Sequence, residues 1–171
     1  MAQIGVYFLL DTSASMYGVP LQILYEAYDF VVRHLARFNG THQLTFSVVY
    51  YESQLYKICH NQPIPPILPA ISPAGASRLG DALSHVGVWL KTDSTRQQHA
   101  LIILIADDLG NDNWSSGCQI LDQFDGQMTL IAIACEQQTR LHELCHVAKA
   151  FSLKQPDILE TWLKQFMGRR H

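Results

Sequence analysis

The sequence lacks the features that define several large classes of protein. No apolar run is long enough to span a bilayer, and no basic segment precedes the first apolar run at Ile4. Charged residues make up only 16% of the chain, its net charge is −3, and its only basic cluster is Arg169-Arg170. Nucleic-acid-binding domains usually carry a basic face. We therefore expect neither a membrane span nor a nucleic-acid partner.

Cysteine is also scarce, and its spacing forms no CxxC pair. The four cysteines are Cys59, Cys118, Cys135 and Cys145. A chain of 171 residues can bury a substantial core, so these cysteines need not act as disulfide staples. Cys135 lies in an apolar run, which predicts a buried thiol. We expect a cytoplasmic protein from a reducing compartment.

Two enzyme signatures are missing as well. The sequence contains no GxSxG motif and no GxxxxGK[ST] motif. The first absence disfavours an α/β-hydrolase, and the second disfavours a P-loop NTPase. A haloacid-dehalogenase nucleophile would need a second Asp at position 13, where this chain has Ser13.

The most informative stretch that is present runs from Ile4 to Gly18. An uncharged apolar run, 4–10, ends abruptly in Asp11-Thr12-Ser13-Ala14-Ser15. A short apolar run that ends in a polar turn is typical of a buried central strand in a parallel sheet. Because ligands bind at the carboxyl ends of strands in open α/β sheets, we expect the polar segment 11–15 to face a ligand.

The rest of the chain alternates between strand and helix patterns. A connection with five prolines, 62–76, excludes a regular helix or a central strand. The order predicts an α/β, doubly wound, Rossmann-like fold: one domain over 1–171, with a six-stranded, mostly parallel sheet, one antiparallel edge strand, and helices on both faces. The predicted strands are 4–10, 43–51, 54–61, 99–106, 128–135 and 148–153, and the predicted helices are 20–38, 78–91, 113–124, 138–146 and 156–167.

Oxygen-bearing side chains follow several of these elements. Asp11 and Asp107 each end a buried strand, Ser13 and Ser15 follow Asp11, and Ser77 opens a predicted helix. Such a set contains no His or Cys, so it suits Mg²⁺, Mn²⁺ or Ca²⁺ rather than zinc. Only two carboxylates stand among several neutral hydroxyls, so this ligand set leaves a small dication electrophilic and partly hydrated. We therefore expect the bound cation to accept an acidic residue from a partner protein.

These residues resemble the metal-ion-dependent adhesion site (MIDAS) of von Willebrand factor A (vWA) domains. The segment 11–15 is similar to that family's DxSxS motif, and 75–83 resembles its second metal loop, with Ser77 in place of the usual Thr. The segment 106–108 resembles the third loop, usually Thr-Asp-Gly, with Asp108 in place of Gly. The resemblance implies the vWA fold, a non-enzymatic role in protein–protein interaction, and a divalent cation, with Mg²⁺ preferred. The implied metal ligands are Asp11, Ser13, Ser15, Ser77 and Asp107.

Within that family, the compact chain is similar to the bacterial tellurium-resistance branch, which is TerY-like. The stretches VYFLLDTSASMYGVPL and GASRLGDAL carry this likeness. The branch implies a tellurite- or stress-resistance system with a protein kinase or a 2C-type phosphatase as a possible partner. We expect Tyr17, Arg78 and Asp108 to contact the partner. Asp108 adds charge beside the metal, which would either raise metal affinity or repel an acidic partner residue.

A second pattern leaves an alternative open. His142-Glu143-Leu144-Cys145-His146 fits HExxH, which on a helix places two His on one face to bind zinc, with Glu as the base. This pattern would make the protein a zinc-dependent hydrolase, or would bind metal without catalysis. A surface helix with partly exposed His is the plain interpretation. Asp93 and Asp112 are interpreted as solvated loop acids.

Overall fold

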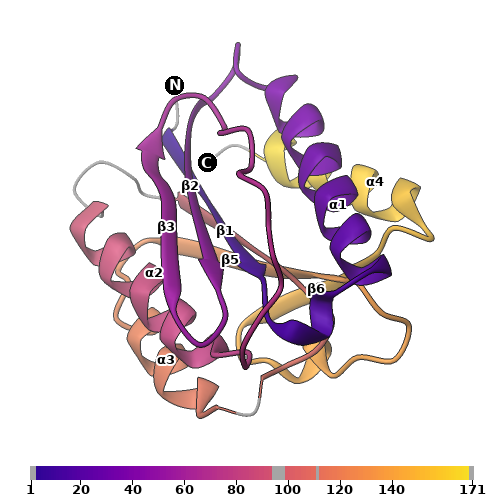
Figure 1. Cartoon of the computed structure of the whole chain (residues 1–171). Helices are drawn as coiled ribbons and strands as arrows, with labels where there is room; N and C mark the ends of the chain where they lie inside the picture. The colour runs from indigo at the N-terminus through magenta and orange to yellow at the C-terminus, as the bar shows by residue number, and fades with distance from the viewer. Residues whose placement is uncertain (1–2, 94–98, 111, 170–171) are drawn as a thin grey trace.

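The computed structural model describes residues 3–93, 99–110 and 112–169. Its strands form one six-stranded sheet in the order β3-β2-β1-β4-β5-β6 (Figure 1). All neighbouring strands are parallel except β2 and β3, which are antiparallel. The predicted sheet, with its antiparallel edge, is therefore confirmed. The strands are β1 (Gln3–Asp11), β2 (Gln43–Tyr51), β3 (Leu55–Gln62), β4 (His99–Ala106), β5 (Gln127–Ala134) and β6 (Val147–Ser152).

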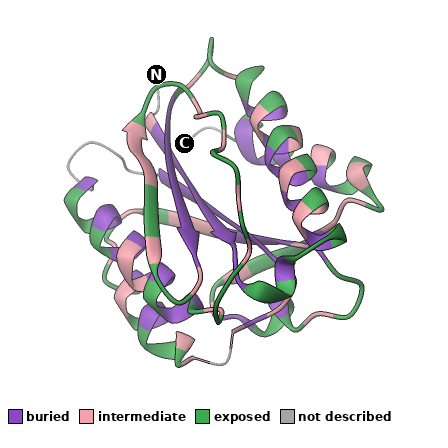
Figure 2. Cartoon of the chain, viewed as in Figure 1, coloured by how far each residue is buried: buried purple, intermediate pink, exposed green. Residues whose placement is uncertain are grey.

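Strand β1 lies at the centre of the sheet because its apolar residues pack on both faces. It pairs with β2 on one side and β4 on the other. Even-numbered side chains such as Phe8 enter one core, and odd-numbered ones such as Leu9 enter the other. Figure 2 shows the central strands buried, while edge strand β3 is largely accessible. This two-sided burial explains why β1 reads as a continuous apolar run rather than an alternating one.

Helices cover both faces of the sheet, as the strand pattern predicts (Figure 1). The first core contains residues of helices α1 (Val19–Ala36) and α4 (Pro156–Gly168), including Leu24 and Leu163. The second contains residues of α2 (Leu79–Asp93) and α3 (Trp114–Leu121), including Leu83. None of the helices in the described residues is long and apolar enough to cross a membrane.

The helix predicted over 138–146 is wrong. The chain forms only a short 3-10 turn, η2 (Leu141–Glu143), and His146 has a left-handed φ of 61°. Strand β6 begins immediately afterwards, so the chain has no room to complete an α-helix before it joins the sheet. Consequently His142 and His146 do not occupy successive turns of one helix face.

Two of the four cysteines, which the sequence did not require to form disulfides, are bridged. Cys118 of α3 and Cys145 form a disulfide that joins the helix to the segment before β6. Cys59 and Cys135 are free, and Cys135 is buried, as predicted. The spacing of 27 residues between the paired cysteines gives no local signal, which is why sequence patterns miss the bridge.

Candidate metal centre

Three loops meet at the carboxyl edge of the sheet, and backbone hydrogen bonds join the first of them to the second. The amide of Ala14 donates to the carbonyl of Gly75 at 3.0 Å, and the amide of Ala74 donates to the carbonyl of Thr12 at 3.0 Å. The third loop, after β4, approaches the second closely: a Cβ added at Gly110 would lie 2.5 Å from the carbonyl oxygen of Ser77. The predicted meeting of these three loops is therefore present in the fold.

Asp11 lies at the centre of this arrangement. Its side chain is fully buried, and its Oδ1 accepts a hydrogen bond of 2.8 Å from the amide of Ser13. Its Oδ2 accepts a 3.3 Å hydrogen bond from the hydroxyl of Ser77. The hydroxyls of Ser13 and Ser15 are 3.2 Å apart. Four of the five predicted metal ligands thus form one connected cluster.

Asp107, the fifth predicted ligand, lies close enough to Asp11 for their charges to interact. Burial raises the pKa of Asp11 to about 6, and the charge of Asp107 adds to this rise, while hydrogen bonds from Ser13 and Ser77 oppose it. Asp107 accepts the amide of Asp108 at 2.9 Å through Oδ1. No Lys or Arg of the described residues contributes to this balance. A buried carboxylate that faces a second, half-buried acid and no basic neighbour is expected to need a cation.

Tyr51 is a member of the cluster that sequence patterns missed. It is the last residue of β2 and lies in register with Asp11. Its side chain is fully buried, and its hydroxyl makes no hydrogen bond of normal geometry with the described residues. The Ser77 hydroxyl, which donates to Asp11, is close enough to interact with it. Burial raises the pKa of Tyr51, as do the charges of Asp11 and Asp107. The sequence feature that could have indicated Tyr51 is its hydroxyl-bearing side chain at the carboxyl end of β2, a second buried strand.

The predicted partner contacts occupy different environments. Tyr17 is 81% exposed beside the first loop, so it is available for contact. Arg78 forms an ion pair of 2.8 Å with Asp81. The Asp108 carboxylate accepts the amide of Arg140 at 2.7 Å and pairs with its guanidinium at 3.3 Å. These contacts with Arg140 hold the pKa of Asp108 below its usual range despite partial burial, so its charge is already balanced.

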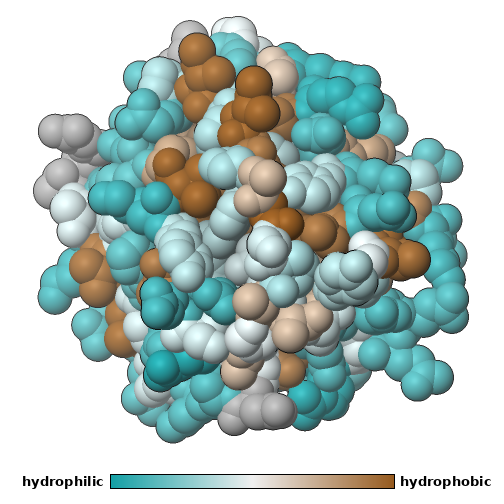
Figure 3. All heavy atoms as spheres, in the orientation of Figure 1, coloured by the Kyte–Doolittle hydropathy of each residue, from teal (hydrophilic) through white to brown (hydrophobic). Residues whose placement is uncertain are grey.

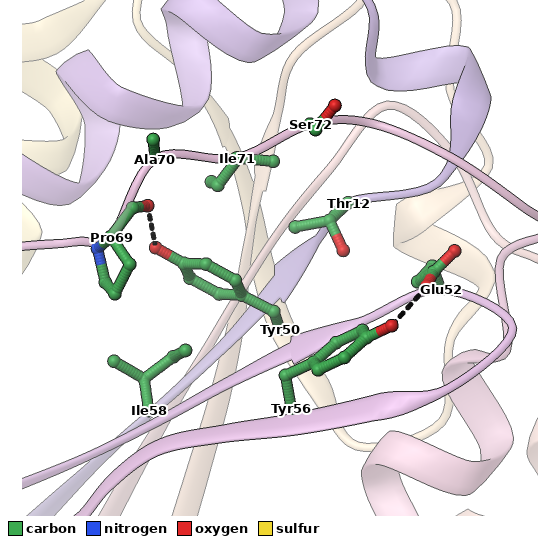
Figure 4. Close-up of a pocket in the computed structure, with 9 residues that line it drawn as sticks. All are labelled: Thr12, Tyr50, Glu52, Tyr56, Ile58, Pro69, Ala70, Ile71 and Ser72. Carbon is green, nitrogen blue, oxygen red and sulfur yellow. Dashed lines mark hydrogen bonds between the residues drawn. The ribbon is translucent and has the colours of Figure 1, made fainter.

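Two pockets lie near the carboxyl edge of the sheet. One, of about 260 Å³, lies between the β2–β3 hairpin and the Pro-rich connection; Thr12, Tyr50 and Glu52 line it (Figure 4). The other, of about 290 Å³, lies between α1 and the ends of β5 and β6; Val19 and Cys135 line it. Figure 3 shows hydrophobic atoms interspersed with hydrophilic ones on the face that carries the Pro-rich connection. The surroundings of the metal loops thus offer both apolar and polar contacts.

The HExxH segment does not form a metal site. Among residues 3–93, 99–110 and 112–169, no group of three or more His, Cys, Asp and Glu side chains is placed to hold a metal ion. His146 instead lies 2.6 Å from Asp122, and Cys145 is in the disulfide. His142 and Glu143 are exposed, and their polar atoms are 4.0 Å apart. The zinc-hydrolase alternative therefore loses the geometry on which it depended.

Asp93 and Asp112, interpreted from the sequence as solvated loop acids, both accept hydrogen bonds from other parts of the fold. Asp93 is 6% exposed, and its carboxylate accepts a 2.7 Å hydrogen bond from the Tyr7 hydroxyl. Asp112 accepts the amide of Gly80 at 2.7 Å, which caps the first turn of α2. That interpretation is therefore wrong. The cap also fixes the start of the helix that follows Ser77.

The solved structures that this chain resembles share the fold of vWA domains. Proximal thread matrix protein 1 from the mussel byssus matches with a TM-score of 0.68 and 19% identity, over 97% of this chain and 46% of that one. A von Willebrand factor type A protein from Catenulispora acidiphila matches with a TM-score of 0.67 and 14% identity, over 97% and 42%. This chain thus spans less than half the length of both. No family model and no curated protein sequence matches it.

A further structure of the mussel protein has a zinc-occupied MIDAS motif. It matches with a TM-score of 0.65 and 15% identity, over 97% of this chain and 45% of that one. The predicted Rossmann-like vWA fold is confirmed by these likenesses together with the six-stranded sheet. At identities this low the likeness extends to the fold alone.

Proposed function

We propose that this chain is a protein-binding module whose binding to its partner depends on a divalent cation. The cation would be held by Asp11, Ser13, Ser15, Ser77 and Asp107. The observation that carries this proposal is the fully buried Asp11 carboxylate, which lies near the second acid Asp107 and has three hydroxyl groups clustered around it. A bound dication would balance both charges and supply a Lewis-acidic position for an incoming carboxylate.

The ligand set favours a hard cation. Carboxylate and hydroxyl oxygens suit Mg²⁺, Mn²⁺ and Ca²⁺, and Mg²⁺ is the preferred candidate. A zinc-occupied MIDAS motif is recorded for the mussel byssus protein, which supports a divalent cation at the corresponding loops. We therefore propose Mg²⁺ or Mn²⁺ as the working ion and include zinc in the test.

The partner would present an acidic side chain to the cation. Tyr17 is exposed beside the first loop and would contact the same partner. Because Asp108 is neutralised by Arg140, it would repel an acidic partner less than its sequence position suggests. We propose binding without catalysis, as the resemblance to the adhesion site of vWA domains implies.

The biological setting proposed from the sequence is bacterial and cytoplasmic. The TerY-like motifs favour a tellurite- or stress-resistance system in which a protein kinase or a 2C-type phosphatase is the partner. Purifying either candidate with this chain, with Mg²⁺ and then with a chelator, tests the pairing. If the chelator leaves the amount of co-purified partner unchanged, metal-dependent binding is contradicted.

Thermal unfolding with each of Mg²⁺, Mn²⁺, Ca²⁺ and Zn²⁺ tests the metal site itself. A ligand that binds only the folded state raises the melting temperature by mass action. We expect Mg²⁺ or Mn²⁺ to raise it for the wild type, but not for the double variant Asp11→Ala and Ser13→Ala. Asp29→Ala, on the exposed face of α1, is the matched control and should keep the full response. An equal response in all three proteins would refute the site.

A further inference from the structure

The Tyr51 hydroxyl is an exception among the buried tyrosines of the central strands. Tyr7 donates to Asp93 at 2.7 Å, and Tyr50 donates to the carbonyl of Pro69 at 2.8 Å. Tyr51 is at least as buried as both, yet its hydroxyl has no partner among the described residues. Buried hydroxyls are nearly always hydrogen-bonded, so an isolated one calls for a ligand or an ordered water.

The surroundings of this hydroxyl indicate which ligand it would meet. Asp11 and Tyr51 are register partners on adjacent parallel strands, so both side chains project from the same face of the sheet. The charges of Asp11 and Asp107 both act on the phenolic oxygen of Tyr51, and the nearby Ser77 hydroxyl interacts with it while donating its own proton to Asp11. The unpartnered hydroxyl therefore belongs to the inner wall of the proposed metal centre.

We propose that Tyr51 is a positioning residue of this centre, and that its hydroxyl hydrogen-bonds a water molecule in the hydration shell of the bound cation. This inference rests on the proposed metal site. Mg²⁺ favours about six oxygen ligands and usually keeps several waters. A water that joins the cation to Asp11 or Asp107 on the buried side needs another polar partner, and Tyr51 supplies one. Tyr51 lies outside the three loops that carry the predicted ligands.

Binding of Mn²⁺ by the full chain, measured by calorimetry with wild type, Tyr51→Phe and Tyr50→Phe, tests the proposal. Groups that orient metal ligands typically change metal affinity by about 10–100-fold when removed. We expect Tyr51→Phe to weaken Mn²⁺ binding about tenfold. Tyr50→Phe removes the neighbouring hydroxyl, which donates to Pro69 rather than facing the site, and should bind like wild type.

Two further readouts separate positioning from a purely structural role. Tyr51→Phe removes a hydroxyl that has no partner, so the melting temperature of the metal-free variant should equal or exceed that of wild type. Adding Mn²⁺ should also perturb tyrosine absorption in the wild type and in Tyr50→Phe, but not in Tyr51→Phe.

The outcomes distinguish the two proposals. If wild type binds no Mn²⁺, the metal site and the role of Tyr51 both fail. If wild type and Tyr51→Phe bind equally well, the metal site stands and the role of Tyr51 is refuted. Equal weakening in both phenylalanine variants would assign the effect to disturbance of strand β2 and would also overturn the role of Tyr51.

Discussion

At the scale of single residues, Asp11 combines two opposing properties. It is fully buried without a basic partner among the described residues, which is costly for a carboxylate. It also accepts hydrogen bonds from two of the other predicted ligands, Ser13 and Ser77. A residue of this kind is expected to reduce the stability of the protein without metal while it provides the binding site.

Replacing Asp11 with Asn should therefore stabilise the metal-free protein. The pKa of Asp11 is raised from 3.8 to about 6, which corresponds to about 3 kcal/mol between the two protonation states. Because the folded-state pKa is the higher one, wild type loses this stability as pH rises from about 4 through about 6. In chelator at pH 7.5, we expect Asp11→Asn to be about 2 kcal/mol more stable in urea unfolding.

Two comparisons check the sign of that effect. Below about pH 3 the Asn and wild-type proteins should have nearly equal stability, because Asp11 is then protonated in both the folded and unfolded states. With Mg²⁺ or Mn²⁺ at pH 7.5, only wild type should gain stability. A lower stability of Asp11→Asn in chelator at pH 7.5 would contradict the unbalanced burial of this charge.

Tyr7 and Asp93 provide a second residue-scale test, away from the metal loops. The Tyr7 hydroxyl donates to the buried Asp93 carboxylate, which also lies 3.4 Å from the ring of His60. Removing a hydrogen bond to a charged buried group costs about 1.5–3 kcal/mol. We expect Tyr7→Phe to lower the free energy of unfolding by about 2 kcal/mol. Tyr56→Phe, at an exposed position, should change it by less than about 0.5 kcal/mol.

At the scale of elements, the Pro-rich connection holds the second metal loop against the first. Figure 1 shows it running along the sheet from the end of β3 to the start of α2. Near its end, Gly75 has a left-handed φ of 69° and accepts the amide of Ala14. Its backbone conformation is one that residues with a Cβ rarely adopt.

Gly75→Ala should disturb both the fold and the metal site. The added Cβ would meet the Ser53 hydroxyl and would lie 2.5 Å from a carboxylate oxygen of Glu52. We expect a loss of about 1–2 kcal/mol in urea unfolding, because the residue is strained and the loop must shift. Mn²⁺ binding should weaken severalfold, since Ser77 is two residues away. Gly40→Ala, which faces open space, is the control and should leave Mn²⁺ binding unchanged.

The helices, strands and loops differ in how well the sequence predicts them. All six strands were predicted to within two residues, because long apolar runs between polar turns have few alternatives. The segment 138–146 failed, because its helical pattern was overridden by the strand that follows it and by contacts of Arg140 with the loop after β4. The meeting of the three loops is predictable from oxygen-bearing residues at strand ends, whereas the position of Tyr51 requires the register between β1 and β2.

At the scale of the whole molecule, the Cys118–Cys145 disulfide bears on the predicted compartment. Disulfides are rare in reducing compartments, so the bridge weighs against the cytoplasmic setting proposed from the sequence. A thiol titration of the unfolded protein decides which applies. Two reactive thiols, at Cys59 and Cys135, are expected if the bridge forms, and four thiols if the protein is fully reduced.

The same bridge should stabilise the fold by restricting the unfolded chain. For a separation of 27 residues, the chain-entropy relation gives about 3.5 kcal/mol. We expect the double variant Cys118→Ser and Cys145→Ser to be less stable by about that amount under non-reducing conditions. Cys59→Ser should have a much smaller effect. If added reductant lowers the stability of the double variant as much as that of wild type, the prediction is wrong.

The hydrogen bonds between the first and second metal loops have a consequence for how the molecule would respond to its surroundings. They join Ala14 to Gly75 and Thr12 to Ala74 through backbone atoms alone, so the protein itself sets the spacing of these loops. A cation would then bind to and dissociate from a preformed site, and its dissociation would not unfold the sheet. Occupancy of the site would follow the free concentration of the ion. The affinity for the partner would therefore depend on that concentration.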